Sequence, residues 1–318
     1  MNGESGHVIP RCGSKLKARR DLKDHLFFRY ERCNKPSQIE KLIRIDTTRE
    51  RTRTMLELYH NDMSTCAQKV RLTLAEKGLA WEGRHLDLRA GDQQKPEYLK
   101  LNPRGVVPTI VDNGKVVRES TVIMEYLDDE YPKPSLRPSN SYARAQMRLW
   151  TKRLDEGHHD IATATLSMGI AFRFQYLEKG QEACDALINR IPDPLRRERR
   201  RDVIYNGVEA REFKTAVRMW EALLTDMEKS LDGTRWLADD NYSLADTAYT
   251  PYLTRLDHLN LLDWMAKRPR LANWYERIRA RPSYESAIKQ CENRAYIDLM
   301  RTKGGEVWHR IKRMIDEL

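Results

Sequence analysis

Residues 56–79, LELYHNDMSTCAQKVRLTLAEKGL, join a strand pattern to a helix pattern through a polar turn. Apolar Leu56 and Leu58 alternate with polar neighbours, which is typical of a half-buried β-strand. From Val70 onward, apolar side chains recur at helical spacing, and Gly78 is a suitable residue to end the helix. We therefore expect the fold to begin with a strand, a tight turn and a helix.

Three small polar residues, Ser64, Thr65 and Cys66, fall at or just inside the start of this helix. The first N–H groups of a helix have no partner within it, and the helix dipole places partial positive charge there. Hydroxyl and thiol groups in this position can hold or stabilise an anion, and a thiolate is one such anion. The simpler interpretation, that Ser64 or Thr65 only caps the helix, stays open on these residues alone.

The composition is that of a well-charged globular chain. Of its 318 residues, 40% are hydrophobic, and no run approaches the roughly 20 apolar residues that a membrane span requires. Five scattered cysteines, without CxxC or metal-ligand spacing, indicate reduced thiols in the cytoplasm and not a disulfide framework. We expect a cytoplasmic protein with no membrane segment and no metal site.

Positive charge is concentrated in residues 1–54. The chain has a net charge of +10, but residues 1–54 hold 14 Lys/Arg and 7 Asp/Glu, a balance of +7, which leaves +3 for the remainder. The main body therefore does not support a nucleic-acid-binding role. Residues 1–54 contain little that could form a core, so we expect a disordered basic extension, with Met55 as the functional start.

The next segments predict a small mixed sheet. Residues 81–88 read as a second strand, and residues 109–111 and 116–118 read as two more, joined by the hairpin turn Asp112-Asn113-Gly114. Residues 121–131 then predict a helix that ends near Pro132. This order of strands and helices indicates a sheet flanked by helices.

The pattern becomes wholly helical from Ser141 onward. Helical spacing of apolar residues predicts helices over residues 145–155, 209–231, 243–256 and 269–281, the third opened by the capping-box sequence SLAD. Residues 175–207 are expected to be less regular. They include the basic run 196–201, which we interpret as a solvated face, with a binding role as the alternative.

Four separated features together resemble the cytosolic glutathione S-transferases. They are the STCAQKVRL turn and helix, the NPRGVVPT segment, the ESTVIMEYL helix start, and the SLAD box in an all-helical second half. The resemblance covers about residues 55–290. The closest subgroup is the bacterial β-etherase type, which cleaves aryl ethers of lignin fragments. The STC turn also resembles the zeta class, which isomerises maleylacetoacetate.

The resemblance implies an N-terminal thioredoxin-like α/β domain followed by a C-terminal all-α glutathione transferase domain. The first would span residues 55–134, the second residues 140–290, and a helical tail residues 291–318. The resemblance also implies a homodimer that uses glutathione as cosubstrate.

The resemblance further implies where glutathione binds. A cis bond between Val107 and Pro108 would let Val107 pair with the cysteinyl unit of glutathione as an added strand does. Ser120 and its N–H would hold the γ-glutamyl carboxylate and Glu119 the ammonium, with Ser64 and Thr65 at the sulfur. The alternatives are an ordinary turn at Pro108 and a simple helix cap at Glu119 and Ser120.

Glutathione must lose its thiol proton near neutral pH, and an ordinary thiol has a pKa of about 8.5. By resemblance, the hydroxyl of Ser64 stabilises the thiolate. Cys66 is the main alternative, since it could form a mixed disulfide with glutathione or point inward as a small buried side chain. Tyr59 and Asn61 could also approach the sulfur.

The electrophile is expected between this turn and the first helices of the second domain. Trp150, Arg153 and His158 are the candidate wall residues, together with His159 and Phe172. The adjacent histidines do not indicate a metal site, because they point to different faces of a helix and no carboxylate-histidine set with metal-ligand spacing accompanies them.

We expect the reaction to be attack of a glutathione thiolate on an electrophilic carbon of a small aromatic substrate, with cleavage of an aryl ether as the specific hypothesis. The alternatives are a zeta-like isomerase or dehalogenase, and a non-catalytic binding protein that keeps the fold. No nucleic-acid or membrane partner is expected.

Overall fold

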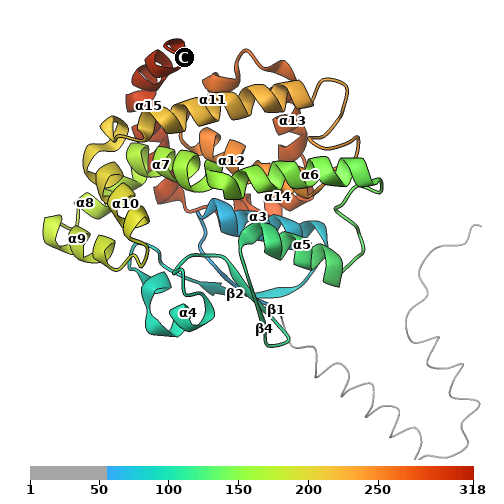
Figure 1. Cartoon of the computed structure of the whole chain (residues 1–318), viewed down its shortest axis with the longest axis horizontal. Coiled ribbons are helices and arrows are strands. Elements are labelled where there is room, and N and C mark those ends of the chain that lie inside the picture. The colour runs from blue at the N-terminus through green and yellow to red at the C-terminus, as the bar shows by residue number, and fades with distance from the viewer. Residues whose placement is uncertain (1–55) are drawn as a thin grey trace, which may run out of the picture. The chain divides into compact units, whose positions relative to one another are not determined.

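The computed structural model describes residues 56–318 (Figure 1). The predictions for residues 1–54 and for Met55 as a start lie outside this range. Within it, a small four-stranded sheet precedes a long series of helices, as the sequence predicted.

The sheet has the strand order β2-β1-β3-β4. Strand β1 (Leu56–His60) pairs in parallel with β2 (Trp81–His85) and antiparallel with β3 (Thr109–Asp112), which forms a hairpin with β4 (Lys115–Arg118). The hairpin turn places Asn113 and Gly114 at φ +50° and +78°. Positive φ at both central residues is the geometry that matches the twist of a hairpin, so the predicted turn is confirmed.

Two helices cover the face of the sheet that is turned towards the helical part (Figure 1). Helix α3 (Thr65–Glu76) and helix α5 (Ser120–Glu130) pack on each other, and α3 also contacts α12 and α14 of the helical part. Their apolar sides form a small core with the strands, which includes Leu58, Val70, Ile110, Ile123 and Leu127. Between β2 and β3 lie a short turn η1 (Asp92–Gln94) and helix α4 (Pro96–Leu101).

The helical part contains a second, larger core. Its helices are α6 (Ser141–Arg153), α7 (Ala164–Ser167), α8 (Arg173–Leu177), α9 (Gln181–Asn189), α10 (Pro194–Asn206), α11 (Phe213–Ser230), α12 (Leu244–His258), α13 (Pro269–Arg279), α14 (Pro282–Ala287) and α15 (Arg294–Asp316). Short 3₁₀ turns are η4 (Gly207–Glu209), η5 (Leu262–Met265) and η6 (Lys289–Cys291). The apolar stripe of α11 is buried in this core, as its spacing predicted.

Two details of the helical part bear on the prediction. The capping box is confirmed, because Ser243 and Asp246 exchange side-chain and backbone hydrogen bonds at the start of α12. The expectation of an irregular segment over residues 175–207 was wrong, since α8, α9 and α10 occupy it. Its many charged residues obscure the apolar spacing, but α9 and α10 each still bury a few apolar side chains.

Two π-helical stretches interrupt the long segment after α6, namely η2 (Leu154–Thr163) and η3 (Met168–Phe172). Inside η2, Glu156 and Gly157 leave helical geometry, with Gly157 at φ +118°. Wider turns of this kind rotate the side chains that follow relative to a regular helix. Within residues 56–318, no helix is both long and apolar enough to cross a membrane.

Candidate active site

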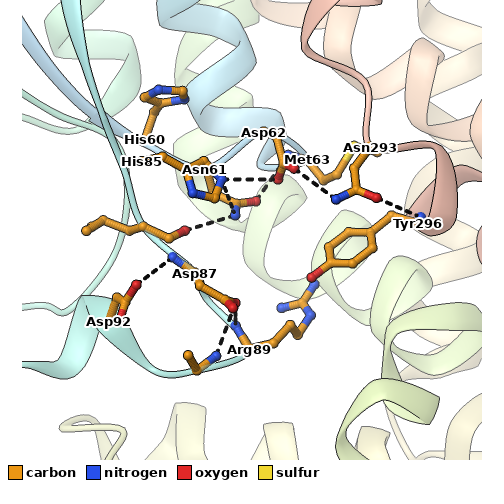
Figure 2. Close-up of polar contacts among 12 residues, drawn as sticks. His60, Asn61, Asp62, Met63, His85, Asp87, Arg89, Asp92, Asn293 and Tyr296 are labelled. Atoms are coloured by element: carbon orange, nitrogen blue, oxygen red, sulfur yellow. Dashed lines mark hydrogen bonds and ion pairs between the residues drawn. The ribbon is translucent and has the colours of Figure 1, made fainter.

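The turn between β1 and α3 is fixed by hydrogen bonds from several elements (Figure 2). Asn61 donates to the carbonyl of Leu86 at 3.0 Å, and its side-chain oxygen accepts from the N–H of Met63 at 3.1 Å. The carboxylate of Asp62 accepts from Asn293, which caps the start of α15. The C-terminal helix therefore helps to hold a turn more than 200 residues away in the sequence.

Two buried arginines hold the backbone of the same turn. The guanidinium of Arg71 donates to the carbonyls of Asn61 and Asp62 at 3.0 and 2.8 Å. Arg255, on α12, donates to the carbonyl of Met63. Because buried carbonyl groups need partners, these bonds stabilise one conformation of the turn that precedes α3.

Ser64 is the N-cap of α3, and its hydroxyl oxygen accepts from the N–H of Ala67 at 3.3 Å. Thr65 and Cys66 follow as the first residues of the helix. The capping role of Ser64 does not use its own hydroxyl proton, which remains available to donate to an anion in front of the helix.

A cleft of about 380 Å³ opens in front of this helix start. It lies between the sheet part and the helical part, and residues from both line it. The polar and charged members, with the turn at Pro108, are Ser64, Cys66, Lys69, Arg89, Gln93, Arg104, Val107, Pro108, Glu119, Ser120, Asp155, His159, Asp160, Tyr176, Arg196 and Arg200.

One wall of the cleft is the turn before β3. The bond between Val107 and Pro108 is cis, as predicted. The preceding carbonyl of Val106 accepts from the hydroxyl of Tyr98 at 2.6 Å and from the side chain of Asn102 at 2.9 Å. These bonds hold the turn so that Val107 lines the cleft.

The start of α5 forms the adjacent wall. Glu119 has φ +66°, an uncommon conformation for a residue other than glycine, and it provides no side-chain cap for the helix. Its carboxylate pairs with Arg104 at 2.5 Å. The first N–H groups of α5, beginning at Ser120, therefore face the cleft without a side-chain acceptor from Glu119, and this is a suitable place for an anion.

Cys66 has a histidine partner from the helical part. Its Sγ lies 3.4 Å from Nε2 of His159, and Nδ1 of His159 lies 3.2 Å from the hydroxyl of Tyr252. Burial raises the pKa of the Cys66 thiol, but His159 and Lys69, with hydrogen bonds from His159 and Ser120, lower the pKa to about 6. Since burial raises the pKa of Tyr252 well above its ordinary value, its hydroxyl stays protonated and can donate a hydrogen bond to His159.

Comparison with known proteins agrees with this geometry. The family models "Glutathione S-transferase, N-terminal domain" and "Glutathione S-transferase, C-terminal domain" match residues 63–130 and 196–277. Protein LigF of a Sphingobium species is 31% identical over 265 residues, which cover 79% of this chain and 99% of LigF. The chain belongs to the glutathione S-transferase family.

Two further matches agree with membership of the glutathione S-transferase family. The crystal structure of beta-etherase LigF superposes with a TM-score of 0.67 and covers 74% of this chain and 100% of that one. The tetrachloro-p-hydroquinone reductive dehalogenase of Sphingobium chlorophenolicum is 26% identical and covers 73% of this chain and 95% of the dehalogenase.

The structure brings most of the predicted glutathione-binding residues of this family member together. Ser64, Val107, Pro108, Glu119 and Ser120 all line the one cleft, together with Cys66. Thr65 is buried at the start of α3 and does not contribute to the lining.

Of the predicted wall residues for the electrophile, the structure places His159 at the cleft but not the others. Trp150 donates its ring N–H to the carbonyl of Leu237, Arg153 pairs with Asp226, and His158 is buried against Trp220. For the two histidines, the helix breaks just before them at Glu156 and Gly157, and His159 lines the cleft while His158 does not. Phe172, Tyr59 and Asn61 also lie outside the lining.

Sequence reasoning missed several charged residues of the cleft, including Lys69, Arg104 and Asp160. Arg196 and Arg200 also line the cleft, and they belong to the basic run for which a binding role was the alternative interpretation. Their spacing of four places them on one helix face. Among residues 56–318, no group of three or more His, Cys, Asp or Glu side chains has the arrangement of a metal site.

Proposed function

We propose that this chain is a glutathione-dependent transferase that cleaves an aryl ether. The main support for the proposal is that the start of α3, the turn at Val107 and the start of α5 all line the same cleft. The likeness to LigF over nearly its whole length supports ether cleavage as the specific reaction.

The cysteinyl and γ-glutamyl units of glutathione would each meet a matching group in the cleft. The backbone of Val107 would pair with the cysteinyl unit, as an added strand pairs with a sheet edge. The free N–H groups at Ser120 would hold the γ-glutamyl carboxylate, and Glu119 would receive the ammonium. The sulfur would then lie in front of α3, next to Ser64.

In this reaction the hydroxyl of Ser64 donates a hydrogen bond to the glutathione sulfur and favours the thiolate. The thiolate attacks the carbon of the ether, so that a carbon–sulfur bond forms and the carbon–oxygen bond breaks. The electron pair leaves on the aryl oxygen, which takes up a proton. The products are a glutathione thioether and a phenol.

The pair of Cys66 and His159 favours a second candidate function, thiol exchange. A Cys66 thiolate would attack the glutathione sulfur of a mixed disulfide, form a disulfide between Cys66 and glutathione, and release the other sulfur as a thiolate. A second glutathione thiolate would then regenerate Cys66 and leave as glutathione disulfide.

Titration of the bound glutathione thiol separates these candidates. The ultraviolet absorbance of the thiolate is followed against pH for the wild type, Ser64→Ala and Cys66→Ala. We expect a depressed thiol pKa that rises only in Ser64→Ala. A rise only in Cys66→Ala would favour thiol exchange, and no depressed pKa in any variant would indicate a binding protein without transferase activity.

A second helix cap provides the control. Asn140 caps α6 by accepting from the N–H of Ala143 at 2.7 Å, and it lies outside the cleft lining. Both Ser64→Ala and Asn140→Ala should cost about 1 kcal/mol of stability. Only Ser64→Ala should change the pKa of bound glutathione.

We also infer a homodimer in the cytoplasm. Membership of the family supports the dimer, and the scattered cysteines support a reducing compartment. Sedimentation velocity of the full chain tests the dimer, and a purely monomeric profile would contradict it.

A further inference from the structure

The basic run of α10 contains two kinds of arginine. One kind is held by neighbouring groups: Arg197 donates to a backbone carbonyl, and Arg199 and Arg201 pair with the carboxylates of Glu212 and Asp185. These three side chains stabilise the contacts of α10 with adjacent segments. They account for only part of the run.

Arg196 and Arg200 differ, because they lie one helical turn apart and line the cleft. Both also line two smaller cavities beside it, of about 60 and 50 Å³. Within residues 56–318, neither guanidinium has a hydrogen bond or an ion pair with another side chain or carbonyl. Burial lowers the pKa of Arg200, and the neighbouring Arg196 and Arg89 lower it further, so that Tyr176 and Asp160 offset the loss of water only in part.

The cleft as a whole carries more positive than negative charge. Its basic side chains are Lys69, Arg89, Arg104, Arg196 and Arg200, and its acidic side chains are Glu119, Asp155 and Asp160. Glu119 is engaged by Arg104, and Asp155 accepts from Thr121 at 2.6 Å. Asp160 alone remains near Arg196, and it also faces His159. One carboxylate does not balance two arginines.

We infer that Arg196 and Arg200 bind a carboxylate, and that this carboxylate belongs to the electrophile. The inference rests on the proposed function, and it makes the second substrate an aromatic acid. A guanidinium presents a planar fork of donors that matches a carboxylate, so two of them on one helix face form a suitable receptor.

The position of the two arginines favours the electrophile over glutathione as the source. The cavity of about 60 Å³ is lined by His159, Asp160 and neighbouring residues of the helical part, and by none from the sheet part. Glutathione, in contrast, is expected along Val107 and Ser120 of the sheet part. The glycine carboxylate of glutathione is the alternative source of the bound carboxylate. The cavity of about 50 Å³ is lined by Gln93 of the sheet part as well as by Arg196 and Arg200, so glutathione could reach the arginines there.

Binding of glutathione conjugates to the full chain tests the inference without relying on turnover. Isothermal titration calorimetry measures the affinities for glutathione, S-benzylglutathione and S-(4-carboxybenzyl)glutathione at fixed ionic strength. We expect the wild type to bind the carboxybenzyl conjugate about tenfold more tightly than the benzyl conjugate. Arg196→Gln and Arg200→Gln should each reduce this preference, and the double variant should abolish it, with little change in affinity for glutathione.

Arg218→Gln is the matched control. Arg218 is exposed on α11, outside the cleft lining, so this variant removes the same charge at a distance. It should keep the preference, and an equal loss would show that the preference reflects only net charge. Circular dichroism of each variant checks that it is folded.

Three other results would overturn the inference. Equal affinity of the wild type for both conjugates would mean that the electrophile's carboxylate is not recognised. A parallel loss of affinity for glutathione and both conjugates in the arginine variants would assign the arginines to glutathione. Failure of the wild type to bind any of the three ligands would overturn the proposed function as well.

Discussion

The Sγ of Cys66 lies 3.4 Å from Nε2 of His159, although the two residues are 93 positions apart in the sequence. The contact joins the start of α3 to the π-helical stretch η2. It gives a thiol at a helix N-terminus a nearby imidazole, which is the environment of a reactive cysteine.

The reactivity of Cys66 should therefore depend on His159. Since the pKa of the Cys66 thiol is lowered to about 6, its alkylation by iodoacetamide should reach half of its maximal rate near that pH. His159→Gln should shift the midpoint upward, towards or beyond the ordinary thiol value of about 8.5, because burial then opposes ionisation. Peptide mass spectrometry identifies the modified residue. His309→Gln, on the exposed side of α15, is the control, and an unchanged midpoint in His159→Gln would refute the coupling.

Stability should fall on acidification through His158. Burial, together with Arg153 and His159, lowers the pKa of His158 to about 3, whereas an unfolded histidine has a pKa near 6.5. Between these values the unfolded chain binds a proton that the folded chain does not. The free energy of unfolding should thus decrease by up to about 1.4 kcal/mol for each unit of falling pH.

His158→Gln should make this pH dependence shallower between pH 6.5 and 4.5. Urea unfolding at several pH values measures the slope, so a general loss of stability in the variant does not affect the test. The same slope in wild type and variant would show that His158 does not contribute.

The buried pair of Lys77 and Asp128 should be strongly coupled. Both side chains are fully buried, and Nζ of Lys77 lies 2.7 Å from Oδ1 of Asp128. Lys77 also donates to the carbonyl of Pro134 at 2.7 Å. Lys77→Met should cost about 2 kcal/mol of unfolding free energy, because Asp128 loses its buried counterion and keeps only the partly exposed Arg137. Lys152→Met, which breaks an exposed pair with Glu156, should change stability very little.

A double-mutant cycle in urea with Lys77→Met and Asp128→Asn measures the coupling directly. The double variant should lose clearly less stability than the sum of the two single losses. Additive losses would mean that the two charges do not stabilise each other.

The adjacent glycines of α15 should respond to alanine in opposite directions. A Cβ at Gly304 would lie 1.6 Å from the carbonyl oxygen of Leu259, at the end of α12, so Gly304→Ala should lower the melting temperature strongly. A Cβ at Gly305 would meet only the side chain of Asn260 at 3.5 Å. Gly305→Ala should therefore be neutral or stabilising by up to about 1 kcal/mol. Similar melting temperatures for the two variants would contradict the close packing of α15 on α12.

Features that depend on a few neighbouring residues could be predicted from the sequence. The strand and helix around Ser64, the hairpin turn at Asn113 and Gly114, and the capping box of Ser243 follow from alternation, helical spacing and turn chemistry. The resemblance to a known family added the cis bond before Pro108. The expected fold class and the glutathione-binding part of the cleft rest on these features.

The tertiary structure alone decided which residues of the helical part face the cleft. Because the helix breaks at Gly157 in η2, regular helical spacing does not predict where His158 and His159 point. In the structure, His158 is buried against Trp220 and His159 contacts Cys66. Arg196 and Arg200 likewise differ from their neighbours only in the partners that folding provides. A local pattern fixes the face of an element, but the packing of distant elements determines what that face contacts.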